Sequence, residues 1–324
     1  MRSTHQTAFM KISIIMLSFN NYDETTGKCL NALAADPDFK TWEVIVVDNS
    51  SDAKTQQQLA EAKRRYPEVH FIFNFQNVGF AAGNNIGIKM STGDIIILLN
   101  SDAFLSPGML GRLTEHFSCN TQLGMVGPVT NAAGNEQCIY TKTGSMEEKI
   151  NEGIRFALSG ESGTLLAYRL DFFCVAIHRR VLEKVGLLDE NFGRGYYEDL
   201  DYSLRVKAAG FKLGMAEDTF VYHRGSASFG NIPLETKELL KRNKRLIVQK
   251  HGAGVLFQHA RQANLAVLSQ YMNKINAGET IPDYRIANRL QQAQNGLPKS
   301  WFKRWRHLRQ TREIAKKLTG NSQL

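Results

Sequence analysis

The stretch 94–102 constrains this 324-residue chain more than any other feature of its sequence. An apolar run at 95–99 is followed at once by Asn100, Ser101 and Asp102. This pattern is typical of a strand buried on both faces, and ligands of open α/β sheets bind at the carboxyl ends of such strands. Asn100 and Asp102 can point to one face of an extended chain, where their oxygens suit Mg²⁺ or Mn²⁺ holding a diphosphate. A strand end with a solvated or helix-capping Asp102 is the alternative.

Strands alternate with helices before this stretch. The sequence predicts strands at 12–19, 42–47 and 70–74 and helices at 23–35 and 54–66, and a Gly- and Asn-rich helix entry at 77–87. This order indicates right-handed βαβ units and a parallel sheet. The first strand is not followed by G-x-G-x-x-G, and no glycine-rich loop contains G-K-[ST]. A dinucleotide-binding dehydrogenase and a P-loop NTPase are therefore disfavoured.

The second half of the first 230 residues predicts further strands and one long loop. Strands are expected at 125–129, 170–178 and 212–222, with helices at 107–119 and 179–185. Residues 131–163 are rich in Gly, Asn, Ser and Thr and have little periodicity, so we expect a loop there. Loops of that length in a compact domain are usually functional or mobile.

A second acidic stretch opens a helix that ends at Gly210 and contains Glu198, Asp199 and Asp201. Carboxylates in a first helical turn are favoured by the helix dipole, so a structural role stays open. Three acids among aromatic residues, after a glycine-rich entry, exceed what a cap requires and favour a catalytic cluster. His223, at the end of the last predicted strand, gains functional weight only if it lies near Asp102.

The positive charge is concentrated in the last part of the chain. From residue 231 onward there are 18 Lys and Arg against 5 Asp and Glu, whereas the first 230 residues hold 22 and 26. We therefore expect a domain at 1–230 and a basic helical extension at 231–324. Its last helix interleaves Trp301, Phe302 and Trp305 with cations, which is typical of the surface of an anionic membrane. Packing against another subunit, as in an oligomer, or against a domain of the chain is the first alternative, and nucleic acid is less favoured.

Other features bear on where the chain resides. No apolar run approaches the roughly 20 residues that cross a bilayer. The first 11 residues have no signal-peptide pattern, and the four cysteines have no C-x-x-C or zinc-like spacing. We expect a cytoplasmic protein with reduced thiols, peripheral on the inner face of the cell membrane.

Five motifs together resemble the inverting family 2 glycosyltransferases, which have the GT-A fold. The motifs are Ser-Ile-Ile-Met-Leu-Ser-Phe-Asn-Asn at 13–21, Val-Ile-Val-Val-Asp-Asn-Ser-Ser at 44–51, 77–87 with Asn100-Ser101-Asp102, the acidic helix at 192–210, and His-Arg-Gly-Ser at 223–226. The likeness runs from about residue 12 to 228 and is greatest to the rhamnosyltransferase-like branch. It implies an α/β, Rossmann-like, mostly parallel sheet flanked by helices, with the C-terminal helices as an addition.

The resemblance also implies roles for donor-side residues. The residues expected to contact the nucleotide are Ser18, Asn20, Asp48, Gly79, Asn84, Asn85, Asn100 and Ser101. Asp48 would accept a hydrogen bond from the base, and the Gly79 loop would lie against ribose and diphosphate, a turn and helix entry being the alternative. Asp102 and His223 would bind Mg²⁺ or Mn²⁺, which stabilises charge on the leaving group. Asn100 replaces a carboxylate common in the family motif, so the metal would depend more on Asp102 and His223.

On the acceptor side the resemblance implies that Asp199 is the general base and that Glu198 orients the acceptor, with exchanged roles as the alternative. Neighbouring like charges would raise the pKa of the base. The implied activity is metal-dependent transfer of a hexose or deoxyhexose from a dTDP- or UDP-sugar to a glycan hydroxyl, in assembly of a bacterial O-antigen, capsule or cell-wall glycan. The acceptor would be carried on a polyprenyl diphosphate. A nucleotidyltransferase and a non-catalytic sugar-nucleotide or glycan-binding module are the competing functions.

Overall fold

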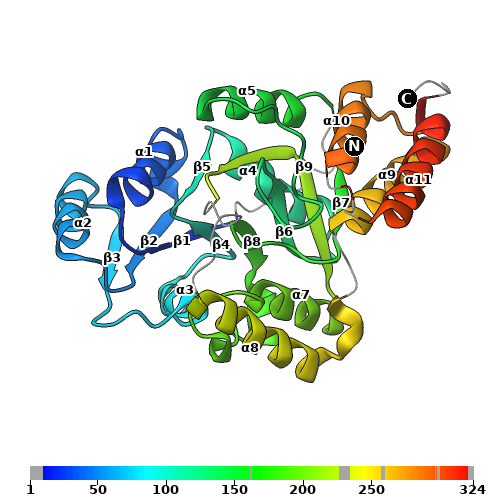
Figure 1. Cartoon of the computed structure of the whole chain (residues 1–324). Coiled ribbons are helices and arrows are strands. Elements are labelled where there is room, and N and C mark those ends of the chain that lie inside the picture. The colour runs from blue at the N-terminus through cyan, green and yellow to red at the C-terminus, as the bar shows by residue number, and fades with distance from the viewer. Residues whose placement is uncertain are drawn as a thin grey trace.

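The computed structural model describes residues 10–160, 163–225, 234–256, 260–295, 297 and 300–319. Nine strands form one central sheet in the order β3-β2-β1-β4-β8-β6-β9-β5, with β7 paired to β9. Helices cover the sheet on both faces (Figure 1). The strands are β1 (Ile12–Ser18), β2 (Glu43–Asp48), β3 (His70–Phe73), β4 (Ile95–Asn100), β5 (Ala103–Leu105), β6 (Leu123–Val129), β7 (Thr164–Leu166), β8 (Cys174–His178) and β9 (Lys212–His223).

The helices follow the predicted alternation in the first half and accumulate at the end of the chain. They are α1 (Thr26–Ala34), α2 (Ala53–Arg65), α3 (Phe80–Met90), α4 (Met109–Cys119), α5 (Met146–Ala157), α6 (Arg179–Val185), α7 (Glu198–Ala208), α8 (Leu234–His251), α9 (Ala260–Asn276), α10 (Asp283–Asn295) and α11 (Trp301–Thr319). Short 3₁₀ turns lie at 22–24, 39–41, 190–192 and 253–256.

The strands β3, β2, β1 and β4 are parallel to one another. Ile14 of β1 lies between Val44 of β2 and Ile97 of β4, and all three side chains are buried. Because both faces of these strands are covered, their sequences are nearly continuous apolar runs. The carboxyl ends of β1, β2 and β4 meet at one edge of the sheet, so the polar residues that follow each strand are brought together.

The rest of the sheet is mixed. β8 runs antiparallel between β4 and β6, β9 is parallel to β6, and β5 and β7 pair antiparallel with β9. The predicted α/β class with C-terminal helices is confirmed, and the parallel arrangement applies to the first half of the sheet. Ala103 of β5 pairs with His223 of β9, which carries the end of the last strand back to the end of β4.

The prediction of a continuous loop at 131–163 is wrong over 146–157, where α5 lies against β9 at the top of Figure 1. The helix begins with a capping box, in which the Ser145 side chain accepts from the Glu148 backbone and Glu148 accepts from the Ser145 backbone. Phe156, at the other end of α5, is fully buried. The Ser-x-x-Glu spacing was the signal for this helix, and the polar composition around it concealed that signal.

The C-terminal helices pack on the sheet domain through buried polar contacts. Arg289 of α10 is 0% exposed, forms an ion pair of 2.6 Å with Glu217 of β9, and donates to the carbonyl of Glu136 at 2.7 Å. α8 lies beside α7 below the sheet in the view of Figure 1, whereas α9, α10 and α11 gather near β7 at the right. The predicted boundary at 230/231 and the motif residue Ser226 lie outside the described residues. Within the described ranges, no helix is long and apolar enough to span a membrane.

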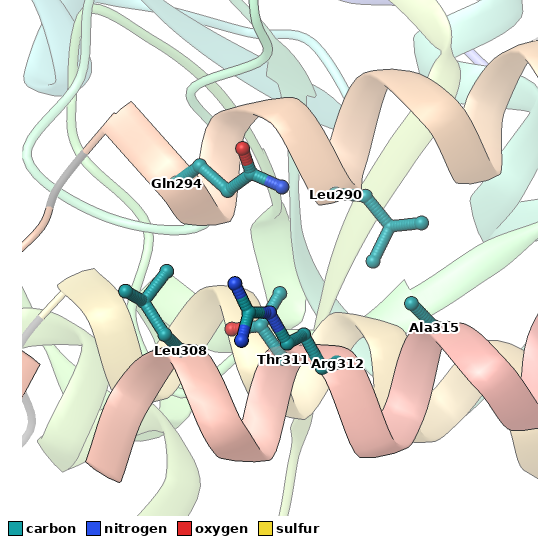
Figure 2. Close-up of a pocket in the computed structure, with 6 residues that line it drawn as sticks. All are labelled: Leu290, Gln294, Leu308, Thr311, Arg312 and Ala315. Atoms are coloured by element: carbon teal, nitrogen blue, oxygen red, sulfur yellow. The ribbon is translucent and has the colours of Figure 1, made fainter. Parts of the chain in front are cut away.

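The last helix, α11, packs by one face only. Figure 2 shows Leu290 and Gln294 of α10 facing Leu308, Thr311, Arg312 and Ala315 of α11 across a small gap. The gap has a volume of about 130 Å³, and beside it His307 contacts the carbonyl of Ala293 at 2.9 Å. The start of α11, residues 301–306, is exposed on all sides.

Candidate active site

Two adjoining cavities lie at the carboxyl ends of β1 and β4. The first, of about 550 Å³, is lined by the ends of β1, β2 and β4 and by the start of α3. The second, of about 560 Å³, is lined by the start of α7, the segments 132–134 and 169–173, and the end of β9. Phe80, Asn100 and Arg194 line both cavities. The two cavities are therefore compartments of one cleft that share a wall.

The structure brings Asp102 and His223 together beside that wall. Asp102 Oδ1 lies 3.4 Å from His223 Nε2. His223 Nδ1 contacts the carbonyl oxygen of Ala132 at 2.8 Å, and the imidazole stacks on Phe173 with a centroid distance of 5.3 Å and an interplanar angle of 19°. Since a carbonyl only accepts, Nδ1 carries a proton. Burial lowers the pKa of His223, but Asp102 and the Ala132 carbonyl raise it, and the net direction is upward.

The pair fits a divalent cation by its chemistry. A histidine that ligates a metal commonly donates its other N–H to a backbone carbonyl, as His223 does, which leaves Nε2 for the metal. Within the described part of the chain, no group of three or more His, Cys, Asp or Glu side chains could hold an ion. Asp102 and His223 would therefore supply two ligands, and Mg²⁺ or Mn²⁺ would complete its coordination with water and substrate phosphate oxygens.

The donor-side residues Ser18, Asn20 and Asp48 have partners inside the protein. Asp48 is 1% exposed and accepts from the backbone and hydroxyl of Ser51 and from Gln56. The Ser18 hydroxyl lies 2.8 Å from that of Thr26. Asn20 accepts from the backbone of Asp52 at 2.8 Å. None of the three lines either cavity, and their hydrogen bonds hold the strand ends in place. Their contact with the nucleotide stays a prediction.

The loop residues Asn84 and Asn85 are likewise internal. Asn84 donates to the carbonyl of Phe80 at 2.9 Å, and Asn85 exchanges hydrogen bonds with the backbone of Leu188 at 2.9 and 3.1 Å. Both are buried, which agrees with the helix-entry alternative. Gly79 has φ 88°, and a Cβ there would lie 2.1 Å from the carbonyl oxygen of Gly193. This glycine allows two loops of the cleft to touch.

Of the eight residues predicted on the donor side, Asn100 and Ser101 line the first cavity. The residues that sequence reasoning missed are Leu17, Phe19, Asn49, Ser50, Asn77, Phe80 and Arg194. Several neighbour predicted residues: Phe19 lies between Ser18 and Asn20, and Asn49 follows Asp48. The polar clusters at the strand ends correctly indicated where the cavity lies. Successive side chains in these extended segments point to opposite sides, and this decides which of them face the cavity.

The second cavity contains the two predicted catalytic carboxylates. Glu198 and Asp199 stand in the first turn of α7, after Tyr196 and Tyr197 with φ 72° and 77°. Glu198 is 8% exposed, and its Oε2 has no hydrogen-bond partner in the described part of the chain. Burial and the charge of Asp199 raise the pKa of Glu198 to about 8. Burial and the charge of Asp171 raise the pKa of Asp199 to about 6, against a lowering by Arg169.

Asp171 and Arg169 were not predicted as site residues, yet both line this cavity. Arg169 lies 3.4 Å from Asp171, and the buried Asp171 Oδ1 has no hydrogen bond to any described residue. Both precede β8, and Asp171 lies in the stretch 170–178 that was expected to be strand. The negative charge of Asp171 raises the pKa of Asp199, and the positive charge of Arg169 lowers it.

The third acid of the cluster has a structural role. Asp201 is fully buried and is paired with Arg205 at 2.8 Å, Lys250 at 2.6 Å and His251 at 2.8 Å. Burial raises the pKa of Asp201, but the hydrogen bonds from Lys250 and His251 bring it below the ordinary value. Asp201 therefore ties α7 to α8, and only Glu198 and Asp199 face the cavity.

Several proteins of similar sequence are named as glycosyltransferases. The family model described as glycosyl transferase family 2 matches residues 13–186. The low-salt glycan biosynthesis hexosyltransferase Agl10 of Haloferax volcanii is 26% identical over 67% of this chain and 68% of its own length. The dTDP-rhamnosyl transferase RfbF of Shigella flexneri is 25% identical over 71% of this chain and 78% of its own length.

Two solved structures share the fold. The mannosyltransferase PcManGT from Pyrobaculum calidifontis, in complex with GDP-Man and Mn²⁺, has a TM-score of 0.53 at 15% identity and covers 97% of this chain and 89% of its own. GalNAc-T7 with UDP, GalNAc and Mn²⁺ has a TM-score of 0.53 at 14% identity. This match covers 66% of this chain and 44% of the GalNAc-T7 chain. These likenesses establish the GT-A-like fold. Because the family model covers more than half of its residues, the chain belongs to glycosyl transferase family 2.

Proposed function

We propose that this chain is a metal-dependent, inverting glycosyltransferase that moves a sugar from a nucleoside-diphosphate sugar to a hydroxyl of a glycan. The observation that carries the proposal is the shared wall of the cleft. Asn100 and Arg194 separate a cavity containing Asp102 from one containing Glu198 and Asp199. A donor phosphate in the first cavity and an acceptor hydroxyl in the second would meet at this wall.

The first cavity suits the donor diphosphate. Asp102 is the one acid and Arg194 the one base among the described residues that line it. A divalent cation at Asp102 and His223 would neutralise the diphosphate and stabilise charge on the leaving group. Arg194 would place a guanidinium near the same oxygens, where charge-assisted hydrogen bonds are strong. The exposed ring of Phe19 offers a flat face to the nucleotide base.

The second cavity suits a sugar acceptor and proton transfer. Phe172, Phe173, Tyr196 and Tyr197 contribute aromatic surface next to the carboxylates. Asp199 would take the proton of the acceptor hydroxyl. At the same time the hydroxyl oxygen would form a bond to the anomeric carbon of the donor, and the bond between that carbon and the phosphate oxygen would break. With its higher pKa, Glu198 stays protonated at neutral pH and can donate a hydrogen bond to the acceptor, so Asp199 is the better base.

Donor identity decides between the candidate functions. We expect a UDP- or dTDP-sugar with Mn²⁺ or Mg²⁺ to raise the melting temperature, because a ligand of the native state stabilises it by mass action. The donor found this way should release its nucleoside diphosphate in the presence of a glycan acceptor, and EDTA should stop that release. Transfer of the nucleotide itself would indicate a nucleotidyltransferase. Binding without turnover against every acceptor would indicate a non-catalytic module.

The acceptor side of the proposal concerns surface glycans. Relatives named for glycan biosynthesis in an archaeon and for rhamnosyl transfer in a bacterium support a role in surface polysaccharide assembly. An acceptor on a polyprenyl diphosphate would lie at the inner face of the cell membrane. The exposed aromatic side chains of α11 support attachment there: Trp301 is 77%, Phe302 63% and Trp305 48% exposed, among Lys303, Arg304 and Arg306.

Vesicle flotation tests this attachment. The full chain should float with vesicles that contain phosphatidylglycerol and less with neutral phosphatidylcholine vesicles. Replacing Trp301, Phe302 and Trp305 by Ser together should abolish flotation. Phe75→Ser, at a fully exposed aromatic residue of the N-terminal half, should not. Equal flotation of the triple variant removes α11 as the attachment site.

A further inference from the structure

A short loop with unusual backbone geometry joins the two cavities to the catalytic helix. We call residues 192–197 the acceptor loop. Four of its six residues have a positive φ: Gly193 at 68°, Gly195 at 144°, Tyr196 at 72° and Tyr197 at 77°. Positive φ is costly for a residue with a Cβ, so Tyr196 and Tyr197 need support from their surroundings.

That support comes from Asn243 in the middle of α8. Asn243 is 0% exposed, and its Nδ2 donates to the carbonyl oxygens of Phe192 at 2.8 Å, Gly195 at 2.8 Å and Tyr196 at 3.1 Å. One amide group therefore binds both ends of the acceptor loop. The neighbouring Arg242 adds a hydrogen bond of 3.0 Å to the carbonyl of Asn191.

The acceptor loop carries the groups on which transfer depends. Arg194 lies in the shared wall of the two cavities, and the loop continues directly into Glu198 and Asp199 at the start of α7. A movement of the loop backbone would shift Arg194 and both carboxylates together. The donor wall formed by β1, β2 and β4 would stay in place, because its strands are fixed in the centre of the sheet.

We propose that Asn243 is a positioning residue of this active site, and that it acts by donating hydrogen bonds to the carbonyls of the acceptor loop. The proposal rests on the glycosyltransferase function proposed above. It gives the basic extension a part in catalysis: α8 completes the acceptor side of the cleft, although α8 lies outside the residues that the family model matches.

The donor amide, rather than the bulk of the side chain, is the essential feature. Asp has nearly the same shape as Asn but offers the three carbonyls a carboxylate, which cannot donate when ionised. Asn243→Asp should therefore release the loop while filling the same space. Asn243→Ala removes the same donor without adding charge. Asn273→Asp, on the exposed side of α9, introduces the same charge away from the loop and is the control for charge. Leu268→Ala removes a buried side chain of α9 and is the control for a loss of stability in the extension.

The test measures two properties in each full-length variant at a temperature where all are folded. The first is Mn²⁺-dependent binding of the nucleoside diphosphate, with UDP, dTDP and GDP as probes. The second is kcat for release of nucleoside diphosphate from the donor sugar. We expect Asn243→Asp and Asn243→Ala to weaken probe binding by no more than about tenfold, through the shifted Arg194, and to lose about 10²-fold in kcat, the size expected when reacting groups are displaced by about 1 Å. Asn273→Asp and Leu268→Ala should keep both properties.

The outcomes separate this proposal from the function on which it rests. A wild-type chain that binds no probe and releases no nucleoside diphosphate contradicts the function itself. An active wild type with an equally active Asn243→Asp overturns the positioning role alone. Asn243 variants that lose probe binding together with turnover, or that do not fold, show that Asn243 supports the whole domain and likewise overturn the proposal.

Discussion

The two sides of the cleft differ in how their polar groups are partnered. On the donor side, Asp48 is satisfied by Ser51 and Gln56, and Asn49 bonds to Asn77 and to the backbone around Gly79. On the acceptor side, Glu198 Oε2 is buried without a hydrogen-bond partner among the described residues, and Asp171 Oδ1 has the ion pair with Arg169 at 3.4 Å but no hydrogen bond there. Buried polar groups are nearly always satisfied, so such exceptions need a physical reason.

The difference indicates separate tasks. Satisfied groups at the ends of central strands form a rigid wall, which suits binding of the same nucleotide in every cycle. Glu198 and Asp199 are buried carboxylates with raised pKa values, which are poor for stability and suitable for proton transfer near neutral pH. In the proposed function, the donor side would bind by fixed geometry, and the acceptor side would store an electrostatic cost that substrate can relieve.

The largest effect is expected from Asp199→Asn. Loss of the general base should lower kcat about 10²- to 10⁴-fold. Because Asp199 lines only the second cavity, binding of the nucleoside diphosphate with Mn²⁺ should be unchanged. Steady-state kinetics and titration calorimetry measure the two effects, with the exposed Asp38→Asn as control.

The opposite result would exchange the roles assigned to Asp199 and Glu198. If Asp199→Asn turns over normally and Glu198→Gln is inactive, Glu198 is the base. If both variants lose nucleoside diphosphate binding, the two sides of the cleft are not independent, and the comparison above is wrong.

A smaller effect is expected on the donor side from changes near the metal ligands. Asp102→Asn should raise the Mn²⁺ concentration that gives half-maximal activity about 10- to 100-fold, since it removes the one carboxylate of the pair. Asn100→Asp adds a second carboxylate and should lower that concentration. A metal titration of activity checks both, and Asp189→Asn, remote from this cavity, should leave the requirement unchanged. Equal metal requirements in all variants would remove Asp102 as a ligand.

Glu198→Gln should stabilise the folded protein while it impairs the enzyme. The pKa of Glu198 is raised from 4.5 to about 8, so its contribution to stability is fully present below pH 4.5 and is lost as the pH rises through 8. Gln has the same shape and no charge to bury. We expect the free energy of unfolding to rise by about 1–3 kcal/mol at pH 8.5 and to change little at pH 4.5. Denaturant titrations at both pH values test this. A variant less stable than the wild type at pH 8.5 would show that favourable interactions in the folded protein offset the cost of burying the ionised carboxylate.

The sequence predicted the fold well in those elements whose pattern of apolar residues follows from burial of the side chains. The apolar runs of β1, β2 and β4 and the helix 179–185 follow from side chains that must leave water. The pairing of β8 with β4 in the antiparallel sense could not be predicted, because a strand buried on both faces has the same composition in either direction. β5 and β7, with three residues each, are too short to show a period.

The site was predictable at the level of strand ends and less so at single residues. Asp102 and His223 were expected to matter together, and a register between β5 and β9 places them 3.4 Å apart. Asp48 and Asn85 are polar residues at the expected places whose side chains bond to nearby backbone instead. Asn243 carried no signal, since its function depends on three carbonyls about 50 residues earlier in the sequence.

The smallest effect expected is a shift in the pH dependence of kcat/KM. Activity should rise with pH as Asp199 loses its proton near pH 6, because the base acts in its ionised form. Burial is the largest cause of the raised pKa, followed by the charge of Asp171, while Arg169 opposes both. Asp171→Asn removes a negative charge and should move the acidic limb to lower pH, and Arg169→Gln should move it to higher pH, each by up to about one unit. Shifts of opposite sign identify Asp199 as the titrating group in this electrostatic setting. A limb that stays at the same pH in both variants would mean that a group outside the second cavity controls the profile, and the reactive side of the cleft would then have to be sought elsewhere.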